Sequence, residues 1–497
     1  MKLLRITLAV LLMSCCTTIS AFDFCADGIY YNILSDTEVE VTDGDERYSG
    51  DITIPENVTY DNVTYSVTTI GSWAFYDCTE LTSIKIPNSI TTIGSYAFGG
   101  CTGLTSIVVA EGNTKYDSRE ECNAIIETAS NTLIVGCKNS VIPNSVTAIG
   151  NYAFYNCRGL TIIEIPNSVT TIGNNPFQNC TGLTSIVVAE GNTKYDSREE
   201  CNAIIVTESN TLIAGCKNSV IPNSVTTIGE SAFNGCTSLT SIEIPNSVTT
   251  IGESAFNGCT SLTSIEIPNS VTTIGNYAFY ICSGLTSIEI PNSVTTIGRS
   301  AFEYCTGLKS IEIPNSVTTI GNYAFYYCSG LTNIEIPNSV TTIGRCAFEY
   351  CTGLKSIEIP NSVTTIGDYA FSGCTGLINI TIGNSVTTIG NYAFSGCTGL
   401  TSITSLIPAE KLFVPGYGAF NSCNNSNCIL YVPAGAKETY AATEGWNEFT
   451  NIVELEDTNI DKVVSPDNSL YFDLNGRGVE NPTRGIYIVN GKKIIVK

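Results

Sequence analysis

Hydrophobic and polar positions alternate within short segments of the central chain, and these segments recur every 23 residues. In LTSIEIPNSVTTIGNYAF, residues 262–279, the apolar side chains of Leu262, Ile265 and Ile267 fall on one side of an extended chain, with polar residues between them. This alternation predicts a short β-strand. Pro268 lacks the N–H group that a sheet ladder needs, so we expect the strand to end before it.

The remainder of each unit predicts a second extended segment, a buried pair and a turn. SVTTIG forms the extended segment and ends at Gly275, Ala278 and Phe279 are expected to enter the interior, and CTG or CSG turns the chain into the next unit. A unit of 23 residues is too short for a strand, its turns and an ordinary helix. The sequence therefore predicts a mostly β structure with little helix.

One phenylalanine marks each unit, and consecutive phenylalanines lie 23 residues apart along most of the array. Two gaps, 98–154 and 177–233, are 56 residues each, which is one unit of 23 and one of 33. The long units share an identical stretch of 25 residues, found at 102–126 and again at 181–205. The chain thus contains two nearly identical long units among its regular ones.

About 14 coils are counted from Leu81 to Leu400. One coil cannot bury its own apolar face, so we expect the coils to stack with neighbouring strands about 4.8 Å apart. Stacking places the apolar side chains and the cysteines in continuous interior columns. The sequence therefore predicts an elongated solenoid, capped at both ends where a bare coil would expose its core.

The motifs L-x-x-I-x-I-P and I-G-x-x-A-F, with the cysteine that follows, recur in fixed register. They resemble the BspA-like (Treponema pallidum-type) leucine-rich repeat family over residues 71–430. The resemblance implies a leucine-rich-repeat solenoid with a parallel concave sheet of about 14 coils (23-residue repeats, two of 33). It also implies a bacterial or protozoan surface protein that binds host proteins and other cells.

The ends of the chain depart from the repeat. Lys2 and Arg5 precede an apolar run at 6–13, which predicts a secretory signal peptide cleaved before Phe22; the alternative is a lipoprotein with Cys15 as the lipid-bearing residue. The predicted segments are a signal peptide (1–21), an N-terminal β cap (22–70), the solenoid (71–430), a C-terminal cap with a short helix (431–455), a linker (456–467) and a small β tail (468–497). The tail resembles the end of C-terminal sorting segments of Bacteroidetes exported proteins.

Charge and composition exclude several classes of function. The net charge of −23 argues against binding to a phosphate backbone, which needs clustered Lys and Arg, so we expect no nucleic-acid partner. The chain has no histidine, the commonest general base and metal ligand. No catalytic constellation is present in the sequence, so we expect no enzyme activity, no cofactor and no metal site. No later stretch is long and apolar enough for a membrane span.

The cysteines fall into two groups. Those with the 23-residue period, such as Cys305 and Cys328, are expected to be buried thiols that act as small hydrophobic residues. Six others bracket short loops and are candidates for structural disulfides, which export would permit. The candidate pairs are Cys122–Cys137, Cys201–Cys216 and Cys423–Cys428.

An acidic stripe is predicted on the outward face of consecutive strands. Its members are Glu243, Glu266, Glu289, Glu312, Glu335 and Glu358. Neighbouring carboxylates about 5 Å apart repel each other, so the stripe must be solvated or meet cations or a basic partner. It is either a ligand-binding surface or a solvated face that keeps the sheet soluble. Its uniform spacing gives no pair of carboxylates with different roles, which argues against a glycosidase.

An aromatic edge is predicted from the variable positions around the Ala-Phe pair. Its members are Tyr277, Tyr280, Tyr304, Tyr323, Tyr326, Tyr327, Tyr350, Arg299 and Arg345. Variable positions of a solenoid point outward, and exposed tyrosine with arginine is a composition typical of interfaces. The alternative is a tyrosine ladder that only covers the edge of the core.

These features favour a secreted or cell-surface binding protein that adheres to host proteins, glycans or other cells. The alternative is a structural surface-layer protein that assembles without a separate ligand. Clustered tyrosine and arginine favour the first interpretation, and the run of identical outward glutamates favours the second. Because function lives in sites rather than in folds, the resemblance alone does not decide between them.

Overall fold

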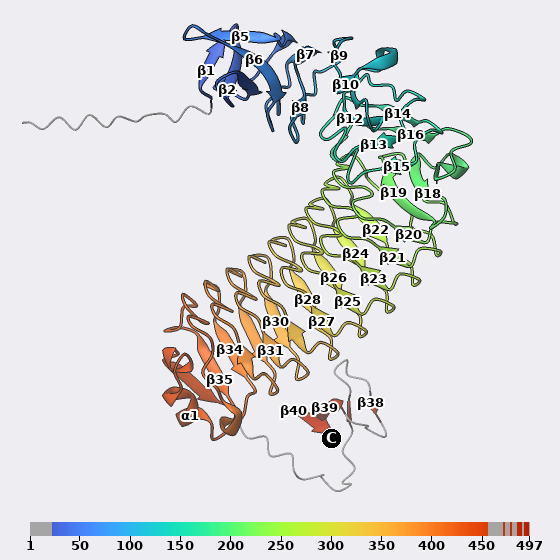
Figure 1. The fold of residues 1–497 in the computed structure, drawn as a ribbon. Coiled ribbons are helices and arrows are strands. Elements are labelled where there is room, and N and C mark those ends of the chain that lie inside the picture. The colour runs from blue at the N-terminus through green and yellow to red at the C-terminus, as the bar shows by residue number, and fades with distance from the viewer. Residues whose placement is uncertain (1–21, 456–470, 473–477, 480–484, 490–491, 497) are drawn as a thin grey trace, which may run out of the picture.

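The computed structural model describes residues 22–455 and four short strands at 471–472, 478–479, 485–489 and 492–496. Figure 1 shows an elongated, curved stack of coils with a β cap at the N-terminal end and a short helix at the other. The predicted fold class, a mostly β leucine-rich-repeat solenoid, is confirmed. The predicted signal peptide, including Cys15, and the predicted linker at 456–467 lie outside the described residues.

The Leu-x-x-Ile segments form a ladder of parallel strands along the solenoid, divided into four sheets. Within each sheet a strand pairs with the equivalent strand of the next coil. Glu266 lies opposite Glu289, and Glu289 opposite Glu312. The strands of this first ladder are β4 (Gly50–Thr53), β7 (Leu81–Ile86), β9 (Ser106–Val109), β14 (Ile162–Ile165), β16 (Ser185–Val188), β22 (Ser264–Glu266), β24 (Ser287–Glu289), β26 (Ser310–Glu312), β28 (Asn333–Glu335), β30 (Ser356–Ile359), β32 (Asn379–Ile382), β34 (Ser402–Ser405), β35 (Ile429–Val432) and β36 (Asn451–Glu454).

The Thr-Ile segments form a second parallel ladder of two-residue strands. Thr319 lies opposite Thr342, and Ile320 opposite Ile343. Its longest run lies in a sheet of eleven strands. The sheet begins with the antiparallel strands β17 (Tyr195–Asp196), β18 (Ala203–Val206) and β19 (Thr211–Gly215). It continues in parallel through the eight two-residue strands β20 (Thr227–Ile228), β21 (Thr250–Ile251), β23 (Thr273–Ile274), β25 (Thr296–Ile297), β27 (Thr319–Ile320), β29 (Thr342–Ile343), β31 (Thr365–Ile366) and β33 (Thr388–Ile389).

The solenoid has about 17 turns rather than the 14 expected. The additional turns come from the ends, where β4 pairs in parallel with β7, β35 with β34 and β36 with β35. These segments lack the repeat motif, because terminal coils face solvent on one side. The capping regions thus continue the first ladder instead of only covering it.

A column of phenylalanine rings runs through the core. Successive rings are nearly parallel, as in Phe279 and Phe302, whose centroids lie 5.5 Å apart. Tyr48 contacts the first ring of the column at 4.6 Å, and the fully buried Trp446 contacts the last at 5.0 Å. The stack is therefore closed at both ends by larger side chains, which keep its terminal rings from water.

Irregular elements flank the repeats. The N-terminal cap is one sheet of β1 (Phe24–Ala26), β2 (Ile29–Ile33), β3 (Glu38–Thr42), β6 (Val63–Ile70) and β5 (Asn57–Tyr60), with β8 (Thr92–Ile93) paired to β6. At the other end lies α1 (Lys437–Ala442). The strands β37 (Tyr471–Phe472), β38 (Gly478–Val479), β39 (Gly485–Val489) and β40 (Lys492–Val496) form a sheet of their own.

Each long unit inserts a hairpin that interrupts the second ladder. In the first, β11 (Ala124–Glu127) pairs antiparallel with β12 (Thr132–Gly136), and β10 (Tyr116–Asp117) pairs with β11. Only then does the parallel ladder resume, from β12 to β13 (Ala148–Ile149) and β15 (Thr171–Ile172). The second long unit repeats this with β17, β18 and β19. The described solenoid therefore contains two breaks of the same construction.

Candidate functional site

Each regular coil has two residues in the left-handed backbone region. The first precedes the Ala-Phe pair, as Tyr277 does with φ of 56°, and the second precedes the cysteine, as Gly258 does with φ of 72°. Residues other than glycine avoid this region because their Cβ atom crowds the backbone, at a cost of roughly 1–2 kcal/mol. The identity of the residue at these positions is therefore informative.

The second left-handed position separates two groups of coils. Glycine occupies it at Gly235, Gly258, Gly373 and Gly396. Four consecutive coils between them carry large side chains there instead: Ile281, Tyr304, Tyr327 and Tyr350. Backbone strain tends to persist at functional sites, where another requirement overrides the cost. These four coils are those of the predicted aromatic edge.

The structure brings the tyrosines of the aromatic edge into one continuous patch. Ring centroids of Tyr304 and Tyr327 lie 5.2 Å apart, and those of Tyr327 and Tyr350 lie 5.7 Å apart. Tyr326 packs edge-on against Tyr304 at 5.5 Å and Tyr350 at 5.9 Å. Tyr280 joins Tyr304 at 5.9 Å. The patch spans several coils without a gap.

Arginine and glutamate complete this patch. The exposed Arg299 guanidinium lies 6.0 Å from the ring centroid of Tyr277 and 5.7 Å from that of Tyr323, within cation–π range. Burial raises the pKa of the half-buried Glu303 and Glu349 carboxyls, although a neighbouring arginine opposes the shift in each case. The edge thus combines exposed rings, cations and partly desolvated acids.

Exposure differs within the aromatic edge. Tyr327 and Tyr350 are 42% and 40% exposed, whereas the other five tyrosines are half-buried. Arg345 is also exposed but lies 5.9 Å from the ring of Tyr369, which the sequence analysis did not include. It also missed the exposed Ile281. Tyr369 continues the column of Tyr277 and Tyr323, and Ile281 stands in the column of Tyr304, so each could have been found from its place in the repeat.

All six glutamates of the acidic stripe are exposed, and all but Glu243 lie on strands of the first ladder. Within the residues that the structure describes, no group of three or more His, Cys, Asp or Glu residues is placed to hold a metal ion. Shallow hollows border Glu243, Glu266 and Glu289 on both sides, lined mainly by Pro, Asn, Ser and Ile residues. The stripe is thus a charged open surface rather than an enclosed site.

The periodic cysteines form a buried column of thiols. The Sγ atom of Cys305 donates to the carbonyl oxygen of Phe279 at 3.2 Å, and that of Cys328 to Phe302 at 3.1 Å. Most coils repeat this contact, in which the thiol bonds a phenylalanine carbonyl of the preceding coil. Except for the half-buried Cys236, the column thiols are buried, which confirms the interpretation as small core residues.

The three predicted disulfides are not formed in the structure, where all six cysteines are free thiols. Cys122 and Cys137 flank the ends of the hairpin, but their Sγ atoms donate to different carbonyls, Ala124 at 3.6 Å and Asn123 at 3.3 Å. Cys201 and Cys216 repeat this arrangement. Cys423 continues the thiol column, with Sγ 2.7 Å from the Phe394 oxygen, rather than joining Cys428.

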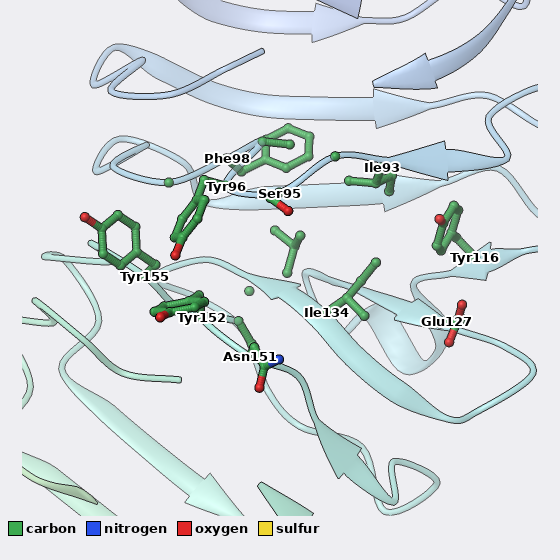
Figure 2. Close-up of a pocket in the computed structure, with 16 residues that line it drawn as sticks. Ile93, Ser95, Tyr96, Phe98, Tyr116, Glu127, Ile134, Asn151, Tyr152 and Tyr155 are labelled. Carbon is green, nitrogen blue, oxygen red and sulfur yellow. The ribbon is translucent and has the colours of Figure 1, made fainter. Parts of the chain in front are cut away.

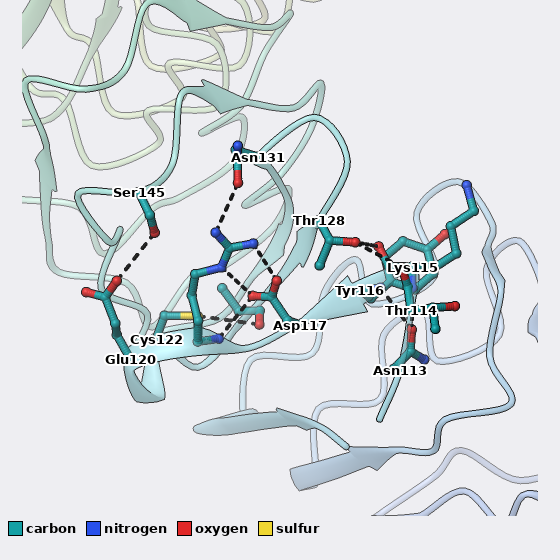
Figure 3. Close-up of polar contacts among 12 residues, drawn as sticks. Asn113, Thr114, Lys115, Tyr116, Asp117, Glu120, Cys122, Thr128, Asn131 and Ser145 are labelled. Atoms are coloured by element: carbon teal, nitrogen blue, oxygen red, sulfur yellow. Dashed lines mark hydrogen bonds and ion pairs between the residues drawn. The ribbon is translucent and has the colours of Figure 1, made fainter. Parts of the chain in front are cut away.

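Polar side chains hold the hairpin of each long unit (Figure 3). The buried Asn113 amide donates to the carbonyls of Pro87 and Ile90 in the preceding coil, and its oxygen accepts from the Tyr116 N–H, each at 2.9 Å. Arg119 donates to the Asp117 carboxylate at 2.7 Å. The second unit has the same bonds from Asn192 and Arg198. The frame is therefore common to both units.

A cavity of about 520 Å³ lies where the first hairpin interrupts the ladder (Figure 2). Tyr96, Tyr152 and Tyr155 line one end, whereas Tyr116 and Glu127 lie at the other. The lining also includes Phe98, Ile134 and Gly136. The sequence analysis did not find this cavity, because its lining comes from three coils and depends on where the hairpin departs.

The tyrosine end of the cavity continues onto the surface as an aromatic cluster. Trp73 stacks on Tyr96 with centroids 4.6 Å apart, and Tyr96 contacts Tyr152 at 4.9 Å and Tyr155 at 5.1 Å. Trp73 is 44% exposed. Burial, with the Tyr152 hydroxyl nearby, raises the pKa of Tyr96 to about 12. The Tyr96 hydroxyl therefore remains a protonated donor at neutral pH.

Solved structures of several bacterial proteins resemble this chain. A leucine rich cell surface protein from Faecalibacterium prausnitzii A2-165 is 29% identical, with 78% of this chain and 96% of that chain covered and a TM-score of 0.41. A leucine-rich repeat protein from Bacteroides ovatus ATCC 8483 is 28% identical, covering 83% and 100% with a TM-score of 0.43. One from Eubacterium ventriosum ATCC 27560 is 25% identical, covering 71% and 93% with a TM-score of 0.49. A search of curated proteins finds no match.

A family model of the BspA type leucine rich repeat region matches most of the chain. The matched residues are 53–135, 131–199, 211–332 and 318–433. They include the first long unit, the second except for residues 200–210, and all the coils of the aromatic edge. The regular coils, the phenylalanine column and the thiol column described above all lie within them. The chain therefore belongs to the BspA type leucine-rich-repeat family.

Proposed function

We propose that this chain is an exported, surface-associated binding protein that adheres to host proteins, glycans or other cells through its aromatic edge. Family membership supports the coarser part of this function, a protein-interaction or cell-surface role. In the described residues no helix is long and apolar enough to cross a membrane.

The assignment of the binding surface to the aromatic edge rests on one observation. Tyr304, Tyr327 and Tyr350 occupy left-handed positions where neighbouring coils use glycine. The core gains little from them, because the rings lie at the surface, and Tyr327 and Tyr350 are about two-fifths exposed. A residue kept against its backbone preference and toward solvent is best explained by an external partner. Tyrosine and arginine are also the residues enriched at interface hot spots.

The contacts would be numerous and individually weak. Each coil repeats the same outward geometry about 5 Å further along the stack, so a long partner meets several tyrosines at once. The exposed Arg299 and Arg345 add charge-assisted contacts to carboxylates or sulfates. An acidic partner is thus favoured at the edge, whereas a basic partner is favoured at the acidic stripe.

The test is binding of the full chain to an array of matrix proteins, mucins and glycans at two salt concentrations. An edge variant carries Tyr323→Ser, Tyr326→Ser and Tyr327→Ser, and a stripe variant carries Glu266→Gln, Glu289→Gln and Glu312→Gln. Saturable binding that only the edge variant loses supports the proposal. Binding that only the stripe variant or high salt removes moves the site to the acidic stripe.

A structural role is the second candidate. Identical glutamates, and the near copies at 276–309 and 322–355 that recur after 46 residues, give the surface a regular outward pattern. Regular patterns favour side-by-side packing of copies. Concentration-dependent assembly in analytical ultracentrifugation, with no hit on the array, would replace adhesion with this role.

A further inference from the structure

Neighbouring coils are joined by a fixed set of backbone bonds at the Ala-Phe turn. In regular coils the first left-handed residue, the phenylalanine and the second left-handed residue each donate an N–H to the next coil. Trp73 donates to Ser95, Phe75 to Ala97 and Asp77 to Gly99, at 2.8–3.1 Å. Ten coils make these three bonds, from that of Phe75 to that of Phe394.

The coil of Tyr96 lacks this set. In the part of the chain that the structure describes, the N–H groups of Tyr96 and Phe98 have no hydrogen-bond acceptor. Both residues line the cavity at the first long unit. Backbone N–H groups away from bulk water are nearly always satisfied, so two adjacent unpaired donors at a cavity wall call for an acceptor.

The same break also removes one ring from the phenylalanine column. Gly136 stands at the phenylalanine position, since its N–H donates to Ala153 and its carbonyl accepts from Cys157 Sγ. It has no side chain to cover the face of Phe98. Phe98 is accordingly 5% exposed, whereas the rings inside the uninterrupted column are fully buried. The core clusters on either side of the break are separate.

We propose that this cavity binds a short peptide of a partner protein, which takes the turn conformation of a regular coil and the place of the missing rung. Two carbonyl oxygens of the peptide, at positions i and i+2, accept from the N–H groups of Tyr96 and Phe98, as Ser95 and Ala97 do for the preceding coil. An apolar side chain of the peptide covers Phe98 beside Gly136. The matched peptide carries a small residue followed by an aromatic one.

Peptide is favoured over other ligands by the spacing of the donors. The donors are two residues apart on one chain, which matches carbonyls i and i+2 of a peptide in the turn conformation of Ser95 and Ala97 rather than ring hydroxyls of a sugar. The tyrosine rings contact one another at 4.9 and 5.1 Å, so they leave no cage for a cation between them. This site is distinct from the aromatic edge, and its occupation does not depend on the adhesive function proposed above.

The second long unit is an internal control. Its frame is the same, but Asn175, Ser231 and Asn234 replace Tyr96, Tyr152 and Tyr155. Among the described residues the N–H groups of Asn175 and Phe177 also lack an acceptor, and Phe177 is 8% exposed, so the missing rung is common to both units. The second break differs in being bridged beside these donors, because the Asn179 N–H donates to the Asn234 carbonyl at 3.3 Å and the Gln178 amide to the Asn234 side chain at 3.2 Å. These bonds hold the flanking coils together, so we expect no peptide to enter.

The experiment titrates the full chain with the blocked pentapeptide acetyl-Asn-Tyr-Ala-Phe-Tyr-amide, the turn sequence of a regular coil, by isothermal calorimetry. The control peptide has Asp in place of Phe. Ile134→Phe fills the cavity, since the Ile134 side chain lies within it (Figure 2). Ile213→Phe makes the same change at the equivalent place in the second unit.

The expected result is one-to-one binding of the Phe peptide that Ile134→Phe weakens at least tenfold and Ile213→Phe leaves unchanged. If Ile134→Phe does not fold, the combined Tyr96→Asn, Tyr152→Ser and Tyr155→Asn variant, which copies residues that the second unit already carries, must show the same loss. No binding, equal loss in both units, binding of a glycan panel instead, or self-association abolished by Ile134→Phe would overturn the proposal.

Discussion

Two neighbouring regions of the solenoid share one backbone and differ in what they place on it. The coils of Phe233 and Phe256 carry Ser231, Ser254, Gly235 and Gly258 at their left-handed positions. The next four coils have the same φ values there but carry Tyr277, Ile281, Tyr304, Tyr323, Tyr327, Cys346 and Tyr350 among them. Both regions have the same phenylalanine stack and the same inter-coil bonds.

This difference shows that folding of a coil does not require large side chains at the left-handed positions. The serine and glycine coils complete every backbone bond that the tyrosine coils do, at less conformational cost. The tyrosines are therefore selected for something other than the coil itself. The same logic applies to the long units, where one frame carries a tyrosine-lined cavity and its copy carries asparagine and serine.

The largest predicted loss of stability, which follows removal of a core phenylalanine ring, should be equal in the two regions. Phe256→Ala and Phe325→Ala each remove a fully buried ring between two stacked neighbours, and we expect each to lower the free energy of unfolding by about 3–5 kcal/mol. Urea unfolding with amide exchange near each site measures the loss. A clearly smaller loss at Phe325 would mean that the tyrosine patch, and not the core, holds that region.

Alkaline pH should weaken both regions through the thiol column. Burial raises the pKa of Cys236 and Cys282 to about 12 from an ordinary value of 9.0. The unfolded chain therefore releases these protons at lower pH than the folded chain, and stability that is complete below pH 9 is lost as the pH rises toward 12. One pH unit above the unfolded pKa, the loss is about 1.4 kcal/mol per thiol.

Single cysteine variants isolate this effect from the titration of tyrosines. Urea midpoints are compared at pH 8 and pH 10 under reducing conditions for the parent chain, Cys236→Ala and Cys282→Ala. Each variant should show a smaller drop between the two pH values than the parent chain. An identical drop in all three proteins would show that these thiols do not contribute.

A smaller effect comes from the left-handed backbone and has opposite signs in the two regions. Ile281→Gly should raise the free energy of unfolding by about 1 kcal/mol, because it removes a β-branched residue from φ of 57°. Gly258→Ala should lower it by about 1 kcal/mol, since a Cβ there meets no atom closer than 3.5 Å and only the backbone opposes it. Thermal unfolding checks both; changes of the same sign would refute the role assigned to strain.

The regular coils could be predicted from the sequence because their period repeats the same physical requirement many times. The strand ending at Pro268 and the buried column at Phe279 follow from alternation and from the need to stack. The additional turns at β35 and β36 could not be predicted from the sequence. They lack the motif and pair only because a ladder edge is already present.

The candidate sites, like the fold, could be predicted from the sequence only in part. Outward tyrosines such as Tyr327 could be listed from their column, but the left-handed φ that makes them informative is visible only in the backbone. The cavity at Phe98 required knowing which inter-coil bonds are missing. The six cysteines proposed to pair were close in sequence, yet their thiols bond different carbonyls.

The most direct measurement uses one variant, Tyr304→Gly, Tyr327→Gly and Tyr350→Gly combined, and records both unfolding free energy and affinity for the partner found on the array. The left-handed cost of roughly 1–2 kcal/mol per tyrosine offsets aromatic contacts worth about 0.5–1.5 kcal/mol each. We therefore predict a stability change below about 1 kcal/mol per residue and an affinity loss of at least tenfold. Unchanged affinity with a stability loss of several kcal/mol would show that the tyrosines only cover the core.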